Sequence, residues 1–123
     1  MKTLTTMLAL ATLAGFTTGL AVAQESEKPS GQEVTVTGEV LDMSCYIDHG
    51  AMGEKHAACA KKCIASGLPV GIKASDGKTY LLIGDHKPAN SELANDAAKT
   101  ITVKGKLASR DGISMIENAV VQK

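Results

Sequence analysis

Large aromatic side chains are almost absent from this 123-residue sequence, which has no tryptophan, one phenylalanine and two tyrosines. Phe16 lies in a segment that we expect to be removed, so only Tyr46 and Tyr80 remain. Two tyrosines are too few for a platform on which nucleic-acid bases could stack. Acidic and basic side chains balance at 13 each, so no net charge attracts nucleic acid or an anionic membrane. We therefore expect no nucleic-acid partner.

Motifs that mark common catalytic and cofactor sites are also missing. The sequence offers no Ser-His-Asp order, no paired carboxylates in a defined pocket and no glycine loop for cradling phosphate. It has no Cys-x-x-Cys-His motif, which argues against a covalently attached haem. We therefore expect a protein that is not an enzyme.

The N-terminus has the features of a secretory signal peptide. Lys2 supplies a positive start, an apolar run covers 7–22, and Ala21-Val22-Ala23 has the small-x-small form of a cleavage site. We place the cut after Ala23, which gives a signal peptide over 1–23 and no membrane span in the mature chain. The expected location is therefore the periplasm or the extracellular space.

The remaining chain is expected to be one domain behind a short leader. Residues 24–32 are polar, contain Pro29 and Gly31, and are interpreted as flexible. Residues 33–123 alternate apolar runs with turn signals and have the size of a single domain. Export into an oxidising compartment favours pairing of cysteines, and the chain has an odd number of them, three.

Hydrophobic periodicity predicts a mainly β protein with two short helices. Period-two alternation and Asp-Gly turn pairs predict strands, whereas Ala-rich and Lys-rich composition with a following Gly67 predicts the first helix. The second helix is expected to start at an Asn90 or Ser91 N-cap and to bury Leu93 and Ala97. The expected strands cover 34–40, 70–74, 78–83, 100–108 and 113–121, and the expected helices cover 54–66 and 90–99.

Two strands share a pattern that points to a barrel. Residues 34–40 and 101–107 have the same alternation, with Gly38 and Gly105 at the same place, and such glycines let long strands bend at the corners of a small barrel. The element order is that of the oligonucleotide/oligosaccharide-binding (OB) fold, a five-stranded partly open barrel. The first helix is then an insertion after strand one, and a plain hairpin sandwich is the alternative.

All three cysteines and two histidines lie between residues 45 and 63, a density found nowhere else in the chain. Cys59, Cys63 and His56 fall within about 60° of one another on a helical wheel, so they share one face. We expect this face to turn the thiols toward the barrel and the neighbouring lysines toward water.

Helix geometry limits which of these side chains can bind one ion. His56 and Cys63 are separated by about 10.5 Å along the axis of a regular helix, far more than two ligands of one zinc ion allow. Cys59 and Cys63 can share an ion, with Cys45 as the third thiolate. The fourth ligand is predicted to be His49, or His56 if the helix starts later than residue 54.

The metal and the alternatives to a metal stay open. Three thiolates with a histidine suit zinc, and thiolates near Met43 or Met52 would suit cuprous copper, although methionines more often serve in packing. A disulfide from Cys45 to Cys59 or Cys63 would instead secure the inserted helix in a structural or interaction module. A redox-active thiol is a further alternative, because His56 or nearby lysines could lower a cysteine pKa.

Other polar residues are assigned ordinary roles. Asp42 and Asp48 flank Cys45 and are interpreted as strand-end or turn residues, with orientation of a histidine or binding of a hard cation as the alternative. His86 lies in a polar loop and is interpreted as a solvated surface side chain.

The runs VTGEVLDMSCY, HAACAKKC and SGLPVGI resemble a group of small exported bacterial proteins with an OB fold. The resemblance covers nearly all of the mature chain, and its specific part is Cys45, His56, Cys59 and Cys63. It implies the fold and an exported location, and it implies no activity. Taken together, the sequence predicts a small exported metal-binding protein that carries or senses copper or zinc, with another envelope protein as its expected partner.

Overall fold

The computed structural model describes residues 29–123. The predicted signal peptide and the predicted leader up to residue 28 lie outside the described residues. The strands are β1 (Glu33–Asp42), β2 (Val70–Ala74), β3 (Thr79–Leu82), β4 (Thr100–Arg110) and β5 (Ile113–Gln122). The helices are α1 (Met43–His49), α2 (Ala57–Ala65) and α3 (Asn90–Leu93), with 3-10 turns η1 (Glu54–His56) and η2 (Ala94–Asp96).

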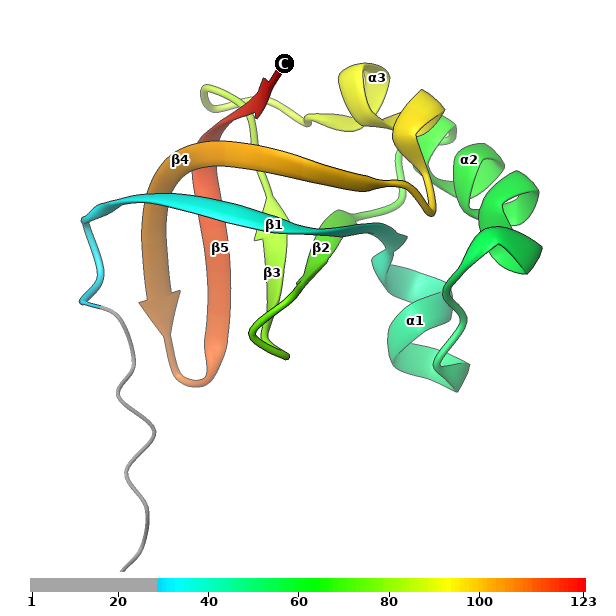
Figure 1. The fold of residues 1–123 in the computed structure, drawn as a ribbon, viewed down its shortest axis with the longest axis horizontal. Helices are drawn as coiled ribbons and strands as arrows, with labels where there is room; N and C mark the ends of the chain where they lie inside the picture. Colours follow the sequence, from blue (N-terminus) through cyan, green and yellow to red (C-terminus); the bar gives the residue numbers. More distant parts are fainter. Residues whose placement is uncertain (1–28) are drawn as a thin grey trace, which may run out of the picture.

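The five strands form a closed barrel in the order β1-β2-β3-β5-β4, with β4 returning to β1. All neighbouring pairs are antiparallel except β3 with β5, which are parallel. The helices gather at one end of the barrel, and the β4–β5 turn lies at the other end (Figure 1). The mainly β, OB-fold-like barrel with a cysteine-bearing helix after strand one is therefore confirmed.

Gly38 lies where β1 changes partners. Toward its start β1 pairs with β4, and from Gly38 onward it pairs with β2, so Gly38 faces Ala74 on one side and Ile101 on the other. A side chain at Gly38 would collide with the backbone of Lys73. The strand runs through this position without a register shift, so close approach of two strands explains the glycine better than a bulge.

The predicted kink at the second glycine takes a different form. The pairing of β4 with β5 shifts register between Lys104 and Lys106, which places an irregularity at Gly105. A side chain there would collide with the backbone at Glu117. Gly105 itself pairs with Val34 of β1, so the two strands with matching glycine patterns lie side by side. A bulge that increases local bending is a common device for closing a small barrel.

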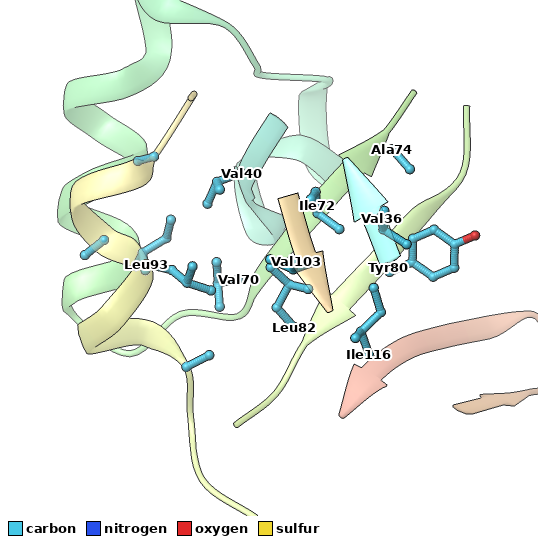
Figure 2. Close-up of a cluster of buried hydrophobic side chains, with 14 of the residues drawn as sticks. Val36, Val40, Val70, Ile72, Ala74, Tyr80, Leu82, Leu93, Val103 and Ile116 are labelled. Atoms are coloured by element: carbon cyan, nitrogen blue, oxygen red, sulfur yellow. The ribbon is translucent and has the colours of Figure 1, made fainter. Parts of the chain in front are cut away.

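The core is built from aliphatic side chains inside the barrel (Figure 2). Along β1 alternate residues are buried, as the period-two pattern predicted, and Val40 has no exposed surface. Ile72, Val103 and Ile116 are likewise fully buried. Tyr80 closes one side of the core and is 4% exposed. Apolar burial of this kind is the main favourable term in folding.

Both Asp-Gly turns form the predicted hairpins. Gly77 has a φ of 87° between β2 and β3, while Asp111 and Gly112 have φ of 51° and 81° between β4 and β5. Positive φ at both central residues makes Asp111-Gly112 a type I′ hairpin turn, which suits the twist of the flanking strands, whereas in the first turn only Gly77 has a positive φ. These turns fix the registers of two strand pairs in the barrel.

Residues 43–49 form a helix, α1, which is not among the two helices predicted from the sequence. The Asp42 side chain accepts a hydrogen bond from the Ser44 N–H at 3.1 Å and caps the N-terminus. Gly50 ends the helix in the left-handed conformation with a φ of 71°. A seven-residue helix is too short to show a clear 3.6-residue pattern, which is why its capping residues were the only signal.

The second predicted helix is shorter than expected and is capped differently. α3 covers only one turn and continues as the 3-10 turn η2, with Leu93 and Ala97 buried as predicted. The N-cap position is Ala89, so the prediction of Asn90 or Ser91 as the cap is wrong. Asn90 instead donates hydrogen bonds to the carbonyls of Ile64 and Leu68, at 2.8 and 2.6 Å. It therefore caps the C-terminal end of α2.

Candidate metal centre

α1 holds Cys45 beside the end of β1. The Asp42 cap starts the helix directly after the last residue of β1, and the Met43 N–H donates to the Pro69 carbonyl at 2.9 Å. The Gly50 N–H closes the other end on the carbonyls of Cys45 and Tyr46. Cys45 is thereby fixed between two anchored helix ends and is partly buried.

α2 packs its small and branched apolar side chains against the barrel. Ala60 is 2% exposed and Ile64 is fully buried, and the helix contacts β1, α3 and η2. Cys63 is partly buried and Cys59 is exposed. The prediction that the thiols face the barrel is therefore wrong for Cys59, because the buried stripe passes through Ala60 and Ile64. The thiols border this stripe on the side of α1.

The three thiols nevertheless converge. The sulfur atoms of Cys45, Cys59 and Cys63 all lie within 4.8 Å of one another, and all three cysteines carry free thiols. Tetrahedral coordination with Zn–S bonds of about 2.3 Å places neighbouring sulfurs about 3.8 Å apart. Small side-chain movements therefore suffice for the three sulfurs to bind one metal ion.

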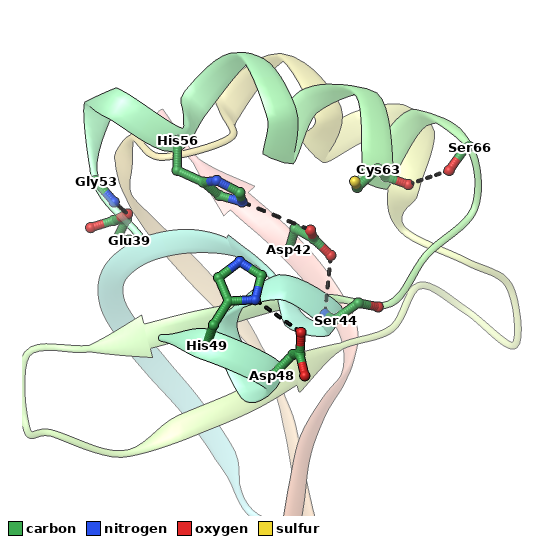
Figure 3. Close-up of polar contacts among 9 residues, drawn as sticks. All are labelled: Glu39, Asp42, Ser44, Asp48, His49, Gly53, His56, Cys63 and Ser66. Carbon is green, nitrogen blue, oxygen red and sulfur yellow. Dashed lines mark hydrogen bonds and ion pairs between the residues drawn. The ribbon is translucent and has the colours of Figure 1, made fainter. Parts of the chain in front are cut away.

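A second group of ligand atoms shares Cys45 with the first. Asp42, Cys45 and His56 each offer one ligand atom, and these atoms also lie within 4.8 Å of one another. His56 Nε2 lies 4.0 Å from Asp42 Oδ2 (Figure 3). Both atoms are buried and neither has a hydrogen-bond partner. Buried polar atoms are rarely left unpaired in native proteins, so this gap is suited to a cation.

The position of His56 follows from the start of the helix. Residues 54–56 form the 3-10 turn η1, and the regular helix begins only at Ala57. The Gly53 N–H donates to Glu39 on β1 and holds this turn against the barrel. His56 therefore lies beside Asp42 and Cys45 and outside the group formed with Cys59 and Cys63. The expectation that His56 and Cys63 are too far apart to bind one ion agrees with this arrangement, although the regular helix starts later than residue 54.

His49 belongs to neither group of ligand atoms among the described residues. Its Nδ1 lies 3.0 Å from Asp48 Oδ2, and both side chains are exposed (Figure 3). Of the two methionines considered, Met43 is buried and a side chain on Gly71 would collide with it, while Met52 is 45% exposed. The structure therefore favours His56 over His49 as the histidine of the site.

Asp42 sets the protonation of the nearby thiols. Its carboxylate favours the protonated thiol, which can donate a hydrogen bond where the thiolate cannot, and so raises the pKa of Cys45 to about 12; desolvation and the carboxylate charge add to the rise. Burial, followed by repulsion from Asp42, raises the pKa of Cys63. Both thiols are therefore protonated at neutral pH in the metal-free protein, which argues against their acting as redox-active thiolates.

Asp42 has a larger role at the site than its position in the sequence indicates. It is 1% exposed, and the sequence assigned it a strand-end role in preference to metal binding. It does end β1 and cap α1, but its second oxygen points toward His56. Its spacing of three residues before Cys45 becomes informative only once α1 is known, because residues three apart on a helix are neighbours.

Comparison with protein-family models, with curated proteins and with solved structures finds no match to this chain. No helix among residues 29–123 is long and apolar enough to cross a membrane. The Cys, His and Asp side chains of this site are near enough to one another to bind a metal ion. The case for a metal centre rests on this geometry.

Proposed function

We propose that this protein binds copper or zinc through Cys45, Cys59 and Cys63 and carries or senses that metal in the cell envelope. The observation that carries the proposal is the convergence of three free thiols within 4.8 Å of one another from two separate helices. Thiolates are the preferred protein ligands of cuprous copper and common ligands of zinc. All three cysteines lie in the segment between β1 and β2, which contains α1, η1 and α2.

The exposure of Cys59 supports carriage or sensing over a purely structural ion. Structural zinc sites are closed, with all positions filled by protein ligands. Here one of the three thiols is open to solvent, so an incoming thiol or imidazole of a partner protein has a route to the bound ion. An ion bound for a short time by ligands from both proteins can pass from one protein to the other without release into water. The proposed partner is another envelope protein.

The proposed location rests on the N-terminal sequence, with its positive start, apolar run and Ala21-Val22-Ala23 site. The resemblance to small exported bacterial OB-fold proteins supports the same location. Immunoblotting of cell fractions with measurement of the intact mass would test it, with the protein expected in the periplasmic or secreted fraction in a form lacking residues 1–23. Recovery of uncleaved protein from the cytosol would contradict it.

A disulfide-stapled module is the second candidate, because the proximity of the three sulfurs also favours oxidation. In that case one bond between Cys45 and either Cys59 or Cys63 would leave a single thiol. The unpaired atoms of Asp42 and His56 would then have no explanation. Metal binding accounts for them, because both atoms are suitable ligands.

The test is to measure metal content and thiol number on the same sample, purified from its own compartment without reductant. We expect at least one equivalent of copper or zinc, and three thiols once the metal is removed by a chelator. Cys59→Ser should lower the metal content, whereas Met52→Leu should leave it unchanged. Protein with no bound metal, one titratable thiol and a mass two units below the reduced value would overturn the proposal in favour of the disulfide.

A further inference from the structure

The pair formed by Asp42 and His56 is not explained by one ion bound to three thiolates. Asp42 is 1% exposed, and its Oδ1 already accepts from the Ser44 N–H. Its Oδ2 faces His56 Nε2 across 4.0 Å, which is too long for a hydrogen bond, and both atoms are buried without partners. A bound group that contacts the carboxylate and the imidazole at the same time would satisfy both atoms.

Charge points to a cation. Among the described residues no lysine or arginine forms an ion pair with Asp42, and His56 is the only basic side chain within 4.0 Å of its carboxylate. Three thiolates and one carboxylate carry four negative charges, and one divalent ion leaves half of them uncompensated beside the buried Asp42. Buried charges are stable only when paired or bound to metal. A second divalent ion would bring the ligand set to neutrality.

Cys45 provides the link between the two positions. Its sulfur lies within 4.8 Å of the sulfurs of Cys59 and Cys63 and also within 4.8 Å of the Asp42 and His56 ligand atoms. A thiolate has lone pairs for two metal ions. Two-metal sites in proteins typically hold their ions about 3.5 to 4 Å apart, a separation that one bridging atom can span.

We propose that the site holds two divalent metal ions, one bound by Cys45, Cys59 and Cys63 and one bound by Asp42, His56 and Cys45. The proposal rests on the proposed function and extends it from one ion to two. The second position combines oxygen, nitrogen and sulfur ligands, a set that suits zinc. With three protein ligands it keeps one coordination place for water or for a ligand from a partner.

The competing explanation is a buried ion pair between ionised Asp42 and protonated His56. It predicts a single bound ion, and it predicts that neutralising Asp42 leaves the metal stoichiometry unchanged. Asp48 and His49 supply a matched control, because they form an exposed carboxylate–imidazole pair on α1 that belongs to neither ligand group.

The experiment is titration of the reduced, metal-free protein with Zn²⁺ alone, followed by native mass spectrometry to count bound ions. The variants are Asp42→Asn and His56→Gln, and the controls are Asp48→Asn and His49→Gln. Asparagine keeps the N-cap bond to Ser44, so Asp42→Asn should fold. Circular dichroism during thermal unfolding checks each fold, and the partly buried His56 supplies a second variant should Asp42→Asn fail to fold.

We expect two zinc ions on the wild-type protein and on both controls, and one on Asp42→Asn and on His56→Gln. A wild-type protein with one ion overturns the second position and leaves the proposed function standing. Two ions on the wild type and on both site variants also overturn it, because the second ion would then lie elsewhere. No bound ion on the wild-type protein would contradict the proposed function itself.

Discussion

Replacing Asp42 with asparagine isolates the influence of one carboxylate on the chemistry of Cys45. Asparagine has nearly the same shape, and its side-chain oxygen can still accept from the Ser44 N–H and cap α1. The change removes the negative charge that favours the protonated thiol. We therefore expect the pKa of Cys45 to fall from about 12 toward its ordinary value of 9.0.

The expected size of the effect follows from the causes of the raised pKa. Asp42 contributes through a hydrogen bond and through its charge, while desolvation of the thiol stays after the substitution. A pKa of about 12 leaves about 1% of Cys45 ionised at pH 10, and a fall of the pKa toward 9.0 raises this fraction many-fold. The thiolate is the reactive form, so the pH profile of alkylation reports this change.

The assay is alkylation by iodoacetamide at several pH values, in reduced and metal-free protein, followed by tryptic digestion. Cleavage after Lys55, Lys61 and Lys62 places each cysteine on its own peptide. The wild-type rate at Cys45 should climb about tenfold per pH unit up to about pH 11, and the Asp42→Asn rate should level off near pH 10 to 11.

Asp48→Asn is the control, because it removes an equal charge from an exposed position on the same helix. Surface charges are screened by solvent, so this control should leave the profile of Cys45 close to that of the wild type. An unchanged profile in Asp42→Asn, or an equal shift in Asp48→Asn, would refute the assigned role of the buried carboxylate.

Three further predictions concern protons and helix capping. Cys45 and Cys63 are protonated at neutral pH, so zinc binding at pH 7 should release at least two protons. Calorimetry in buffers of different ionisation enthalpy measures this number, and a release of less than one proton would contradict the prediction. The folded-state pKa of Cys45 is raised, so its contribution to the stability of the metal-free protein is present below pH 9 and is lost as pH rises from 9 toward 12. Urea unfolding at pH 8 and 10.5 should therefore show a larger loss for the wild type than for Cys45→Ala, and equal losses would exclude the linkage. Asn90→Ala should lower the free energy of unfolding by about 1–2 kcal/mol, because the carbonyls of Ile64 and Leu68 lose the hydrogen bonds from the Asn90 side chain. Ser91→Ala, the exposed control, should stay within about 0.5 kcal/mol, and equal effects would indicate that Asn90 does not cap α2.

The barrel was predictable because its strands are long and half buried. Alternation of apolar and polar residues marked the strands, and Asp76-Gly77 and Asp111-Gly112 fixed two hairpins. The matching positions of Gly38 and Gly105 indicated strands that bend or approach closely, and these two strands are neighbours in the barrel. Periodicity and turn residues depend only on neighbouring positions in the chain, so they can be recognised in the sequence without knowledge of the fold.

The details of the site depended on contacts that local signals do not reveal. α1 buries only Met43, so the sequence has no apolar stripe that would predict this helix. Without α1, the position of Cys45 relative to α2 could not be derived. The orientation of α2 was set by Ala60 and Ile64 packing on the barrel, which left Cys59 exposed. The choice of His56 over His49 followed from a single 3-10 turn at the start of α2.

A thiolate metal centre at Cys45, Cys59 and Cys63 is tested most directly by X-ray absorption at the metal edge of the purified, metal-loaded protein. The site predicts an average of at least two sulfur neighbours per zinc ion, at about 2.3 Å. This number holds whether one ion is bound by three thiolates or two ions share Cys45. A spectrum with only nitrogen and oxygen neighbours at about 2.0 to 2.2 Å would show that the thiols do not bind the metal.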